Sequence, residues 1–553
     1  MMISGRCSAI LAGMAVLFCL YAALFIAHTS FVIGGNRYYS LFDDAMVSMR
    51  YAENLAQGHG LSWNADGEPV EGYTNFLWVI YMSLFHLLPI AKSKISLFVQ
   101  ISGALFLLAN LIFVKKVSEQ IIGGNPFYSL SAVLLTAFYL PLNNWSLQGM
   151  EVGLLVLIVS ASIWLALKGL ESGDFSVWPY ALLGVGILVR PDMALIYLIV
   201  WLGLILGNRT QRSKNVLVGL AIFFLLLLGQ TAFRFWYYHD ALPNTYYLKM
   251  TGYPLLLRMA RGALVTWQFV SRMNVALFLL PFAILFFRRD KFVLMLLAAF
   301  WGQMAYSIYV GGDAWEYWGG SNRYVSIVMP LFFILFCASL AETEVWLAKR
   351  GNRRHPVNIV WIRSLCVIII MLGLVKFNLI CSPNPTLQEW LLRKPALAVR
   401  DNRKMVEEAL LLKEITDPQA TVAVVWAGAI PYFSERPAID MLGKNDRFIA
   451  HLPAKIPPAE EKYTAFYPGH MKWDYSHSIS ALKPDVIAQL YGVTAEEIDS
   501  FLMYDYWKVL IDGYVLHMRM DSPHLHWDLV NSRGQKWRHE KSLIKNHRNN
   551  QGN

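Results

Sequence analysis

The chain has 553 residues, of which 56% are hydrophobic and 16% are charged, and its formal net charge is +10. Soluble domains are usually about 45–50% apolar and about 25% charged, so this composition excludes a disordered chain, a collagen-like chain and an ordinary cytosolic enzyme. We expect a large membrane domain over residues 1–381 and a smaller soluble domain over residues 382–553.

The apolar segments predict a polytopic α-helical membrane protein with about eleven transmembrane helices. A helix needs about 20 apolar residues to cross a bilayer. The first segment lacks a clear cleavage site, so we interpret it as a retained helix rather than a signal peptide. The eleven segments lie near residues 8–28, 75–91, 95–114, 127–142, 150–168, 178–206, 215–236, 262–287, 291–310, 324–347 and 357–381.

Basic residues between these segments predict the orientation, because short basic loops stay on the cytoplasmic side. With eleven spans, four basic loops fall on that side, near residues 92–94, 209–214, 288–291 and 349–354. Lys115 and Lys116 fall on the other side and disagree with the scheme. The same scheme places the first loop, residues 29–74, and the soluble domain outside the cytoplasm.

The first loop contains two adjacent carboxylates, Asp43 and Asp44, just before a helical pattern over residues 45–57. Acidic residues are favoured at helix N-termini, so capping explains one of them. Alternatively, a carboxylate pair at the water–lipid boundary provides a general base for an acceptor hydroxyl or a ligand for a divalent ion. An apolar stripe favours a helix lying along the membrane surface (Met46, Met49 and Leu55).

The sequence DDAMVSMRYAENLAQGHGLSWNADGEPVEGYTNFLW, residues 43–78, closely resembles the first loop of polyprenyl-phosphate-dependent GT-C glycosyltransferases. The nearest group is the AftB-like bacterial arabinofuranosyltransferases. The similarity continues through LQGMEVGL (147–154), LVRPDMAL (188–195), RFWYYHDALPNTYYLK (234–249), YVGGDAWEYWGGSNRYVSIVMP (309–330), AGAIPYFSERPAIDMLGKND (427–446) and PGHMKWDYSHSISALKPDVI (468–487).

This resemblance implies a GT-C fold and an inverting transfer of a pentose, with arabinofuranose as the expected sugar, from a polyprenyl-phosphate donor. By the same resemblance, Asp43 corresponds to the family's proposed catalytic aspartate and Asp44 to its partner. The sequence leaves open which of the two is the base. No sequence feature establishes a cofactor, and the need for a divalent cation, Mg²⁺ or Mn²⁺, stays open.

A departing lipid phosphate needs cations near the outer membrane face. Four residues are candidates for donor and phosphate binding: Arg190, Lys249, Arg323 and His239. Arg190 and Asp192 interrupt an apolar run, which is typical of a functional site or of a buried structural pair. Glu151 falls on the cytoplasmic side in this topology, so we exclude it from the catalytic set.

Polar residues of the outer segments are candidates for substrate binding. Aromatic rings near residue 247 suit a sugar or an isoprenoid chain, or they form an interfacial belt. Arg323 and Asp313 share a glycine-rich loop that suits phosphate, although a surface charge pair explains them equally well. The substrate-binding candidates are Glu71, Tyr73, Asn75, Asn244, Tyr247, Asp313 and His470.

The soluble domain is predicted to be a small α/β domain on the periplasmic face. Residues 421–426 predict a buried strand, residues 436–442 and 484–490 predict further strands, and helical spacing covers 401–412 and 495–503. The basic tail, residues 533–548, favours contact with anionic lipid headgroups over nucleic-acid binding.

We therefore expect a multi-pass protein of a bacterial inner membrane whose active site faces the periplasm and whose acceptor is a surface glycan or a pilin. The alternative is a transporter or flippase of lipid-linked sugars, which would show inverted repeats and charges at mid-membrane. The sequence shows no internal repeat, and its polar residues concentrate in the outer loops. This pattern favours the transferase.

Overall fold

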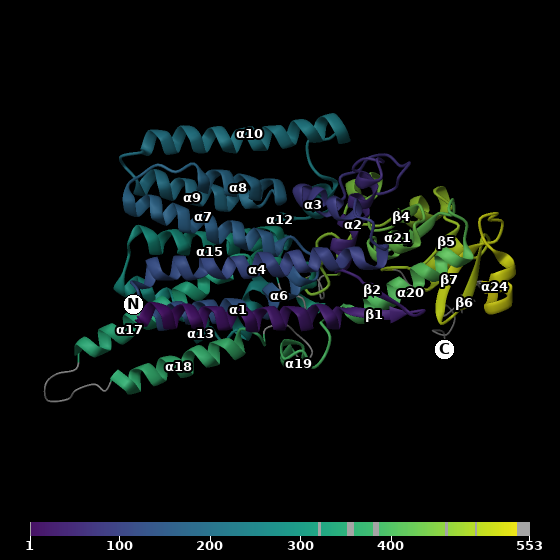
Figure 1. Ribbon diagram of the computed structural model, residues 1–553. Helices are drawn as coiled ribbons and strands as arrows, with labels where there is room; N and C mark the ends of the chain where they lie inside the picture. The colour runs from purple at the N-terminus through teal and green to yellow at the C-terminus, as the bar shows by residue number, and fades with distance from the viewer. Residues whose placement is uncertain are drawn as a thin grey trace, which may run out of the picture.

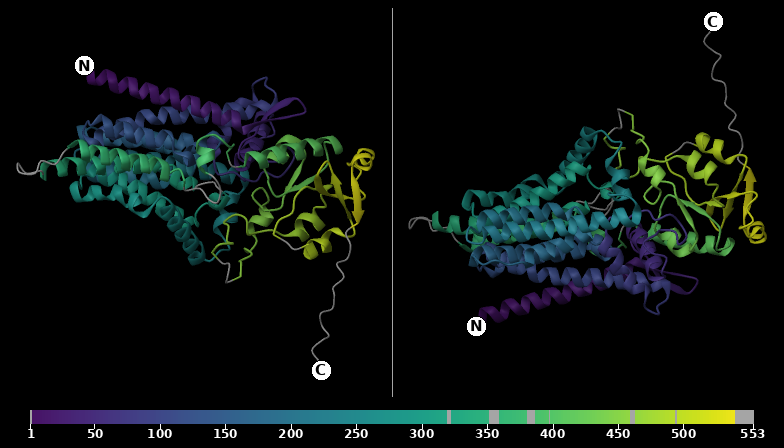
Figure 2. Two further views of the ribbon diagram at one scale, coloured as in Figure 1. Left: turned by 90° about the horizontal axis from the view of Figure 1, so that it is seen from below. Right: turned by 90° about the horizontal axis from the view of Figure 1, so that it is seen from above.

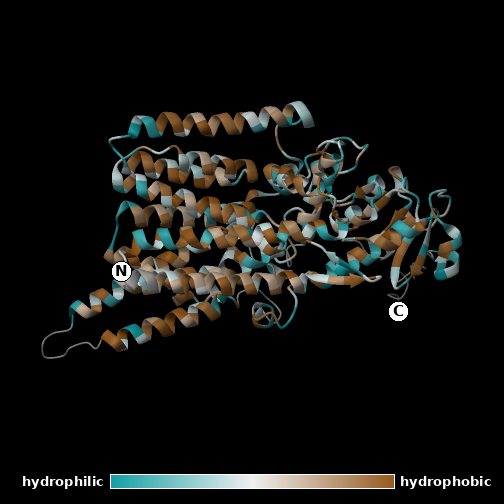
Figure 3. Ribbon diagram, viewed as in Figure 1, coloured by the Kyte–Doolittle hydropathy of each residue, from teal (hydrophilic) through white to brown (hydrophobic). Residues whose placement is uncertain are grey.

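The computed structural model describes residues 2–318, 322–350, 359–379, 386–396, 398–458, 463–492 and 495–538. An elongated bundle of helices carries the C-terminal α/β region at one end (Figures 1 and 2). We call this end of the bundle the domain end. Hydrophobic residues dominate the bundle, and polar residues are more frequent in the C-terminal region (Figure 3).

Seven helices of the described chain are long and apolar enough to cross a membrane, and a bent pair adds an eighth. In the bent pair, α12 (Leu255–Arg272) turns by 103° into residues 275–287, which contain α13 (Val275–Leu279), η1 (Leu280–Ala283) and α14 (Ile284–Phe287). The seven are α1 (Met2–Thr29), α4 (Lys92–Ile122), α7 (Val152–Ser172), α10 (Arg212–Tyr238), α15 (Lys291–Val310), α17 (Met329–Arg350) and α18 (Ile359–Lys376).

Shorter helices complete the bundle, and they are α3 (Phe76–His86), α5 (Pro126–Ala137), α6 (Leu140–Leu147), α8 (Trp178–Val189) and α9 (Met193–Gly207). The chain is thus a multi-pass α-helical membrane protein, as the composition predicts. Four of the expected spans nevertheless differ from the structure. Residues 262–287 belong to the pair bent by 103°, and residues 127–142 are divided between α5 and α6. The other two are the spans expected at 75–91 and 178–206.

The expected span at residues 75–91 is wrong, because α3 starts and ends at the domain end. The ammonium of Lys92, just after α3, lies 2.5 Å from Glu53 and 3.3 Å from Glu435 of the C-terminal region. An eleven-residue helix measures about 16 Å, which is too short for the hydrocarbon core of a bilayer. Lys92 and Lys94 therefore lie at the domain end, opposite to the side expected for them.

The expected span at 178–206 is two antiparallel helices, α8 and α9. The Asn208 amide donates to the carbonyl of Asp174 at 3.2 Å, so the start of α8 and the end of α9 lie side by side. The turn between them, residues 190–192, lies at the domain end. The polar residues that interrupt the apolar run are thus a loop rather than charges inside a span.

Residues 75–91 do not cross the membrane, and residues 178–206 cross it twice. The segments between them therefore lie on the side of the membrane opposite to the one expected. Lys115 and Lys116 move to the end of the bundle where Arg288 donates to the carbonyl of Ile121 at 2.5 Å. Their disagreement with the basic-loop pattern disappears. Glu151 moves to the domain end, so its expected cytoplasmic placement is wrong.

The first loop begins with a hairpin of β1 (Ser30–Ile33) and β2 (Asn36–Tyr39), followed by α2 (Asp43–Ala56). Met46 and Met49 are fully buried, and α2 packs against α3 and the C-terminal region. The expected position of this helix on the membrane surface is therefore wrong, because protein covers its apolar stripe.

The C-terminal region has a six-stranded sheet in the order β4-β3-β5-β7-β6-β8. The strands expected at 421–426, 436–442 and 484–490 are confirmed as β3 (Val422–Val424), β4 (Ala438–Asp440) and β5 (Val486–Ile487). β3 pairs in parallel with β4 and β5. The other strands are antiparallel: β6 (Tyr506–Ile511), β7 (Tyr514–Arg519) and β8 (Gln535–Arg538).

Helices flank this sheet, and the two expected at 401–412 and 495–503 are present. They are α20 (Val399–Ile415) and α23 (Ala495–Leu502). The remaining elements are α19 (Thr386–Trp390), α21 (Ala429–Ser434), α22 (Arg447–His451), a π-helical turn η3 (Ser476–Ala481) and α24 (Trp527–Arg533).

Buried hydrogen bonds join the first loop to the C-terminal region. The Arg50 guanidinium donates to the carbonyls of Pro431 and Arg436 at 3.0 and 3.2 Å. The indole N–H of Trp63 donates to the Ala427 carbonyl at 3.1 Å. Because these carbonyls lie within α21 or close to its two ends, the bonds fix this helix against the first loop.

Candidate active site

Asp43 and Asp44 open α2, but neither carboxylate caps it: the N-cap residue is Phe42, and no side chain caps the helix. Asp43 Oδ1 instead accepts the backbone N–H of Ala429 at 2.9 Å. A Cβ atom at Gly428 would lie 2.1 Å from the Asp43 carbonyl oxygen, so glycine permits this approach. Helix capping therefore explains neither aspartate.

The Asp44 carboxylate lies between two cations from distant parts of the chain. Arg323 Nη1 contacts Oδ2 and Lys444 Nζ contacts Oδ1, both at 2.8 Å. Burial favours the neutral acid, but Lys444, Arg323 and Lys249 outweigh that effect and hold the pKa of Asp44 well below its usual range. Asp44 is therefore ionised at neutral pH.

Asp43 has the opposite electrostatic environment. Burial raises the pKa of its carboxyl to about 7, against the opposing effect of the Ala429 N–H, and the Asp44 charge adds to the rise. Two adjacent residues thus hold one permanent charge and one proton-exchanging group. A group with a pKa near 7 is suited to accept a proton at neutral pH.

Arg323 is fixed by a second carboxylate. It opens α16 (Arg323–Ser326), after η2 (Ala314–Trp318), and its guanidinium contacts Asp313 at 2.7 and 3.1 Å. Asp313 also accepts the Arg323 backbone N–H at 3.1 Å. The Arg323 guanidinium is thus held between the carboxylates of Asp313 and Asp44. Asp313 and Arg323 belong to the same glycine-rich segment of the sequence.

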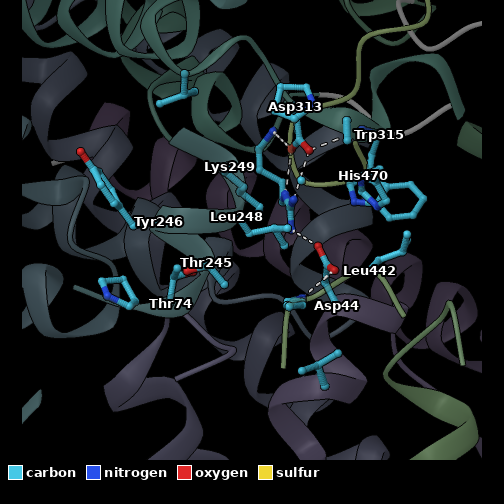
Figure 4. A pocket seen from close by; sticks show the side chains of 18 of the residues that line it. Asp44, Thr74, Thr245, Tyr246, Leu248, Lys249, Asp313, Trp315, Leu442 and His470 are labelled. Carbon is cyan, nitrogen blue, oxygen red and sulfur yellow. Dashed lines mark hydrogen bonds and ion pairs between the residues drawn. The ribbon is translucent and has the colours of Figure 1, made fainter. Parts of the chain in front are cut away.

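A cavity of about 210 Å³ opens beside these groups. It is lined by Asp43, Asp44, Arg190, Asp192, Tyr246, Lys249, Asp313, Trp315, Arg323, Trp426, Lys444 and His470, among others. Figure 4 shows Tyr246 on one side of this space and Trp315 and His470 on the other, with Lys249 and Asp44 between them. The structure thus brings together seven of the residues that the sequence singles out.

Lys249 differs from the other cations of the cavity. It lies on α11 (Asn244–Met250), and within the described chain it makes no ion pair shorter than 4 Å. Burial lowers the pKa of its ammonium to about 8, although the Asp44 charge opposes that change. Lys249 is therefore a cation available to an anionic ligand.

Arg190, in the turn between α8 and α9, contacts Asp192 at 2.8 Å and Glu151 at 3.2 Å. Glu151 in turn accepts the amide of Asn75 at 3.1 Å. Arg190, Asn75 and Tyr73 line a smaller adjoining cavity of about 50 Å³, which also contains Asp44 and Lys249. The charged turn thus reaches the candidate site, held by carboxylates on each side.

Four residues expected in the site do not line either cavity. His239 is exposed at the C-cap of α10, and Glu71 binds Arg234 at 2.8 Å. The Asn244 amide donates to the carbonyls of Gly443 and Lys444 at 3.0 Å, and Tyr247 donates its hydroxyl to Asp240 at 2.6 Å. The polar groups of Glu71, Asn244 and Tyr247 hold the surrounding loops, which sequence proximity alone does not reveal.

Four members of the site cannot be identified from the sequence pattern: Lys444, Trp315, Trp426 and Glu151. Lys444 lies within the segment 427–446 that resembles the glycosyltransferases, but nothing local connects it to Asp44, 400 positions earlier. The position of Glu151 in the sequence does indicate a buried partner, because an acidic residue at the start of an apolar helix is rare without one.

The described residues do not fit a divalent cation at this site. They contain no group of three or more His, Cys, Asp or Glu side chains that could hold a metal ion. Both oxygens of Asp44 already contact cations, and Asp43 Oδ1 accepts a backbone N–H. The donor set therefore suits ion pairs between side chains rather than coordination of a metal ion.

Residues 396–542 match a family model described as a domain of unknown function, DUF8728. No curated protein matches the chain. ArnT from Cupriavidus metallidurans bound to undecaprenyl phosphate is similar in structure, with a TM-score of 0.51 and 12% identity over 92% of this chain and 98% of that one. The Archaeoglobus fulgidus oligosaccharyltransferase in its apo form has a TM-score of 0.51 and 11% identity over 93% and 75% of the two chains.

These similarities concern architecture, because the identities lie far below 25%. They extend along nearly the whole chain and include both the bundle and the C-terminal region. The protein is a multi-pass membrane protein with the GT-C fold.

Proposed function

We propose that this protein is an inverting membrane glycosyltransferase that moves a pentose, arabinofuranose, from a polyprenyl phosphate to an acceptor hydroxyl. The observation that carries the proposal is the position of Asp43, a carboxylate with a pKa of about 7, in the same cavity as Lys249, a cation that forms no ion pair within the described residues. A single displacement needs a base near the acceptor and positive charge near the leaving phosphate.

In the proposed reaction, Asp43 removes the proton of the acceptor hydroxyl as its oxygen attacks the anomeric carbon. The new C–O bond forms while the bond from that carbon to the phosphate oxygen breaks, and the lipid phosphate leaves with the electron pair. Lys249 and Arg190 stabilise the charge of the phosphate. Asp44 remains ionised and holds Arg323 and Lys444 in place.

Three observations support the finer parts of the proposal. ArnT, which has the same fold, binds undecaprenyl phosphate, and this favours a polyprenyl-phosphate donor. The similarity of residues 43–78 to arabinofuranosyltransferases favours arabinofuranose. Basic loops opposite the domain end favour an inner-membrane protein whose site faces the periplasm, where a surface glycan or a pilin is the acceptor.

The test is transfer of radiolabelled arabinofuranose from its undecaprenyl-phosphate ester by the full chain in lipid nanodiscs. Asp43→Asn should reduce turnover about 10²–10⁴-fold, the usual contribution of a general base. Asp66→Asn is the matched control, because Asp66 is an exposed carboxylate of the same loop. Wild-type activity in Asp43→Asn, or no cleavage of the donor by the wild type, would contradict the proposal.

A further inference from the structure

A second cavity, of about 400 Å³, adjoins the cavity that contains Asp43 and Lys249, which we call the catalytic cavity. It lies on the side of the C-terminal region. Trp315, Trp426 and His470 line both cavities, so the two spaces share a wall. Tyr467 and Tyr491 lie on the part that belongs to the second cavity alone. We call this space the aromatic cavity.

The aromatic rings of this cavity have defined orientations. The centroids of Trp315 and Trp426 are 5.3 Å apart with an angle of 31° between the ring planes, and His470 meets Trp315 edge-on at 5.9 Å. Trp315 also packs edge-on against Phe42, the residue before Asp43, at 4.7 Å. The aromatic wall is therefore continuous with the start of α2.

Two polar side chains, those of Gln489 and His470, line the aromatic cavity. Gln489 Oε1 accepts the N–H groups of Val425 and Trp426 at 3.2 and 2.9 Å, which fixes the side chain, and its amide nitrogen has no hydrogen-bond partner in the described chain. The buried Nδ1 of His470 likewise has none. Burial lowers the pKa of this imidazole to about 4, so it is neutral at pH 7.

The ten residues that line the aromatic cavity include no Asp, Glu, Lys or Arg. The catalytic cavity, in contrast, is lined by residues of both charges. A concave, mostly aromatic surface with a few fixed polar groups suits a neutral ligand that has one apolar face and several hydroxyls. A sugar ring meets this description, because its C–H face can pack on indole while its hydroxyls bond an amide and an imidazole.

We propose that the aromatic cavity binds a neutral sugar residue of the acceptor, and hence that the acceptor is a glycan rather than a pilin. This inference rests on the proposed function and identifies the acceptor class of the same site. The sugar beside the reacting hydroxyl packs on Trp426 and Tyr491, and the hydroxyl itself reaches Asp43 past Trp315.

The test compares acceptors and variants in the transfer assay with the full chain. The probes are a neutral oligo-arabinofuranoside, a neutral oligomannoside and a Ser/Thr-containing peptide. Trp426→Ala and Tyr491→Ala should each raise the KM for the accepted oligosaccharide at least tenfold while the KM for the lipid donor stays within twofold. Trp426→Phe should restore most of the loss, and Trp537→Ala, an exposed tryptophan on β8, is the control.

An increase confined to the acceptor KM supports the inference. It is overturned if only the peptide is glycosylated, if neither oligosaccharide is accepted by an enzyme that cleaves the donor, or if both alanine variants keep the wild-type acceptor KM. Failure of the wild type to cleave the lipid donor is a different result, because it contradicts the proposed function itself.

Discussion

At the scale of single residues, the site separates two adjacent carboxylates by their surroundings. Asp44 is paired with Arg323 and Lys444, whereas Asp43 is buried against α21 and accepts a backbone N–H. The sequence offers two identical side chains and cannot rank them. The difference arises from groups 279 and 400 positions away, which only the folded chain brings near.

This contrast predicts a bell-shaped dependence of kcat/KM on pH. Below about pH 7 the rate should fall about tenfold per pH unit, because Asp43 becomes protonated and cannot accept a proton. Above about pH 8 it should fall again as Lys249 loses its charge. The measurement is kcat/KM for the lipid donor from pH 5.5 to 9.5.

Lys249→Arg gives a sharper version of this test. Arginine stays protonated across this range, so the variant should lose the alkaline limb and keep the acid limb. An alkaline limb unchanged in Lys249→Arg would show that another group causes it.

Lys249 also permits a clean removal of positive charge. Because it makes no ion pair in the described chain, Lys249→Met should keep the melting temperature and raise the KM for the lipid donor about 10–100-fold, the usual value of a hydrogen bond to a charged group. Arg323→Met should instead lower the melting temperature, since it leaves the buried Asp313 unpaired. Equal thermal effects of the two variants would contradict this distinction.

At the scale of elements, the position of Asp43 depends on how closely α21 approaches α2. Gly428 has no side chain at the contact, and a Cβ there would overlap the Asp43 carbonyl oxygen. Gly428→Ala should therefore cost about 1–3 kcal/mol of stability and reduce turnover, because α21 must move away from Asp43. Gly229→Ala on α10 is the control: a Cβ there meets nothing within 4 Å. Calorimetry and the transfer assay measure both effects.

The arrangement of α3, α8 and α9 predicts which loops share a side of the membrane. Lys94 is exposed at the domain end, and Arg209 is exposed beyond α9 at the opposite end. Cysteines at these two positions should react with an impermeant thiol reagent from opposite sides of an intact membrane. Labelling of both from the same side would restore the simple eleven-segment scheme and contradict the structure.

At the scale of the whole molecule, Arg50 links the first loop to the C-terminal region. It donates to carbonyls of Trp63, Pro431 and Arg436, all buried. Arg50→Ala should cost about 1–3 kcal/mol for each carbonyl left without a partner and should expose the C-terminal region to limited proteolysis. Arg37→Ala is the control, because the Arg37 guanidinium makes only a solvent-exposed hydrogen bond to Ser30 in the described chain. Unchanged proteolysis of Arg50→Ala would show that other contacts hold the region.

Sequence reasoning predicts the fold class and much of the site, for identifiable physical reasons. Apolar runs reveal membrane helices directly, and the first-loop pattern identifies Asp43 and Asp44. It fails where one apolar pattern is compatible with different structures. Both the segment around α3 and the segment that contains α8 and α9 have the composition of a single span, yet the first does not cross the membrane and the second forms two antiparallel helices. It also fails for Lys444 and Trp426, because their roles depend on contacts between distant segments.

The two cations that flank Asp44 come late in the chain, 279 and 400 positions after it. During synthesis Asp43 and Asp44 are therefore made and inserted with the first loop long before Arg323 and Lys444 are synthesised. A chain that stops short of residue 429 carries an Asp44 without its lysine and an Asp43 without the backbone N–H of Ala429. The order of translation thus withholds the assembled site from nascent and truncated chains, so that the site exists only in a completed protein whose C-terminal region has docked.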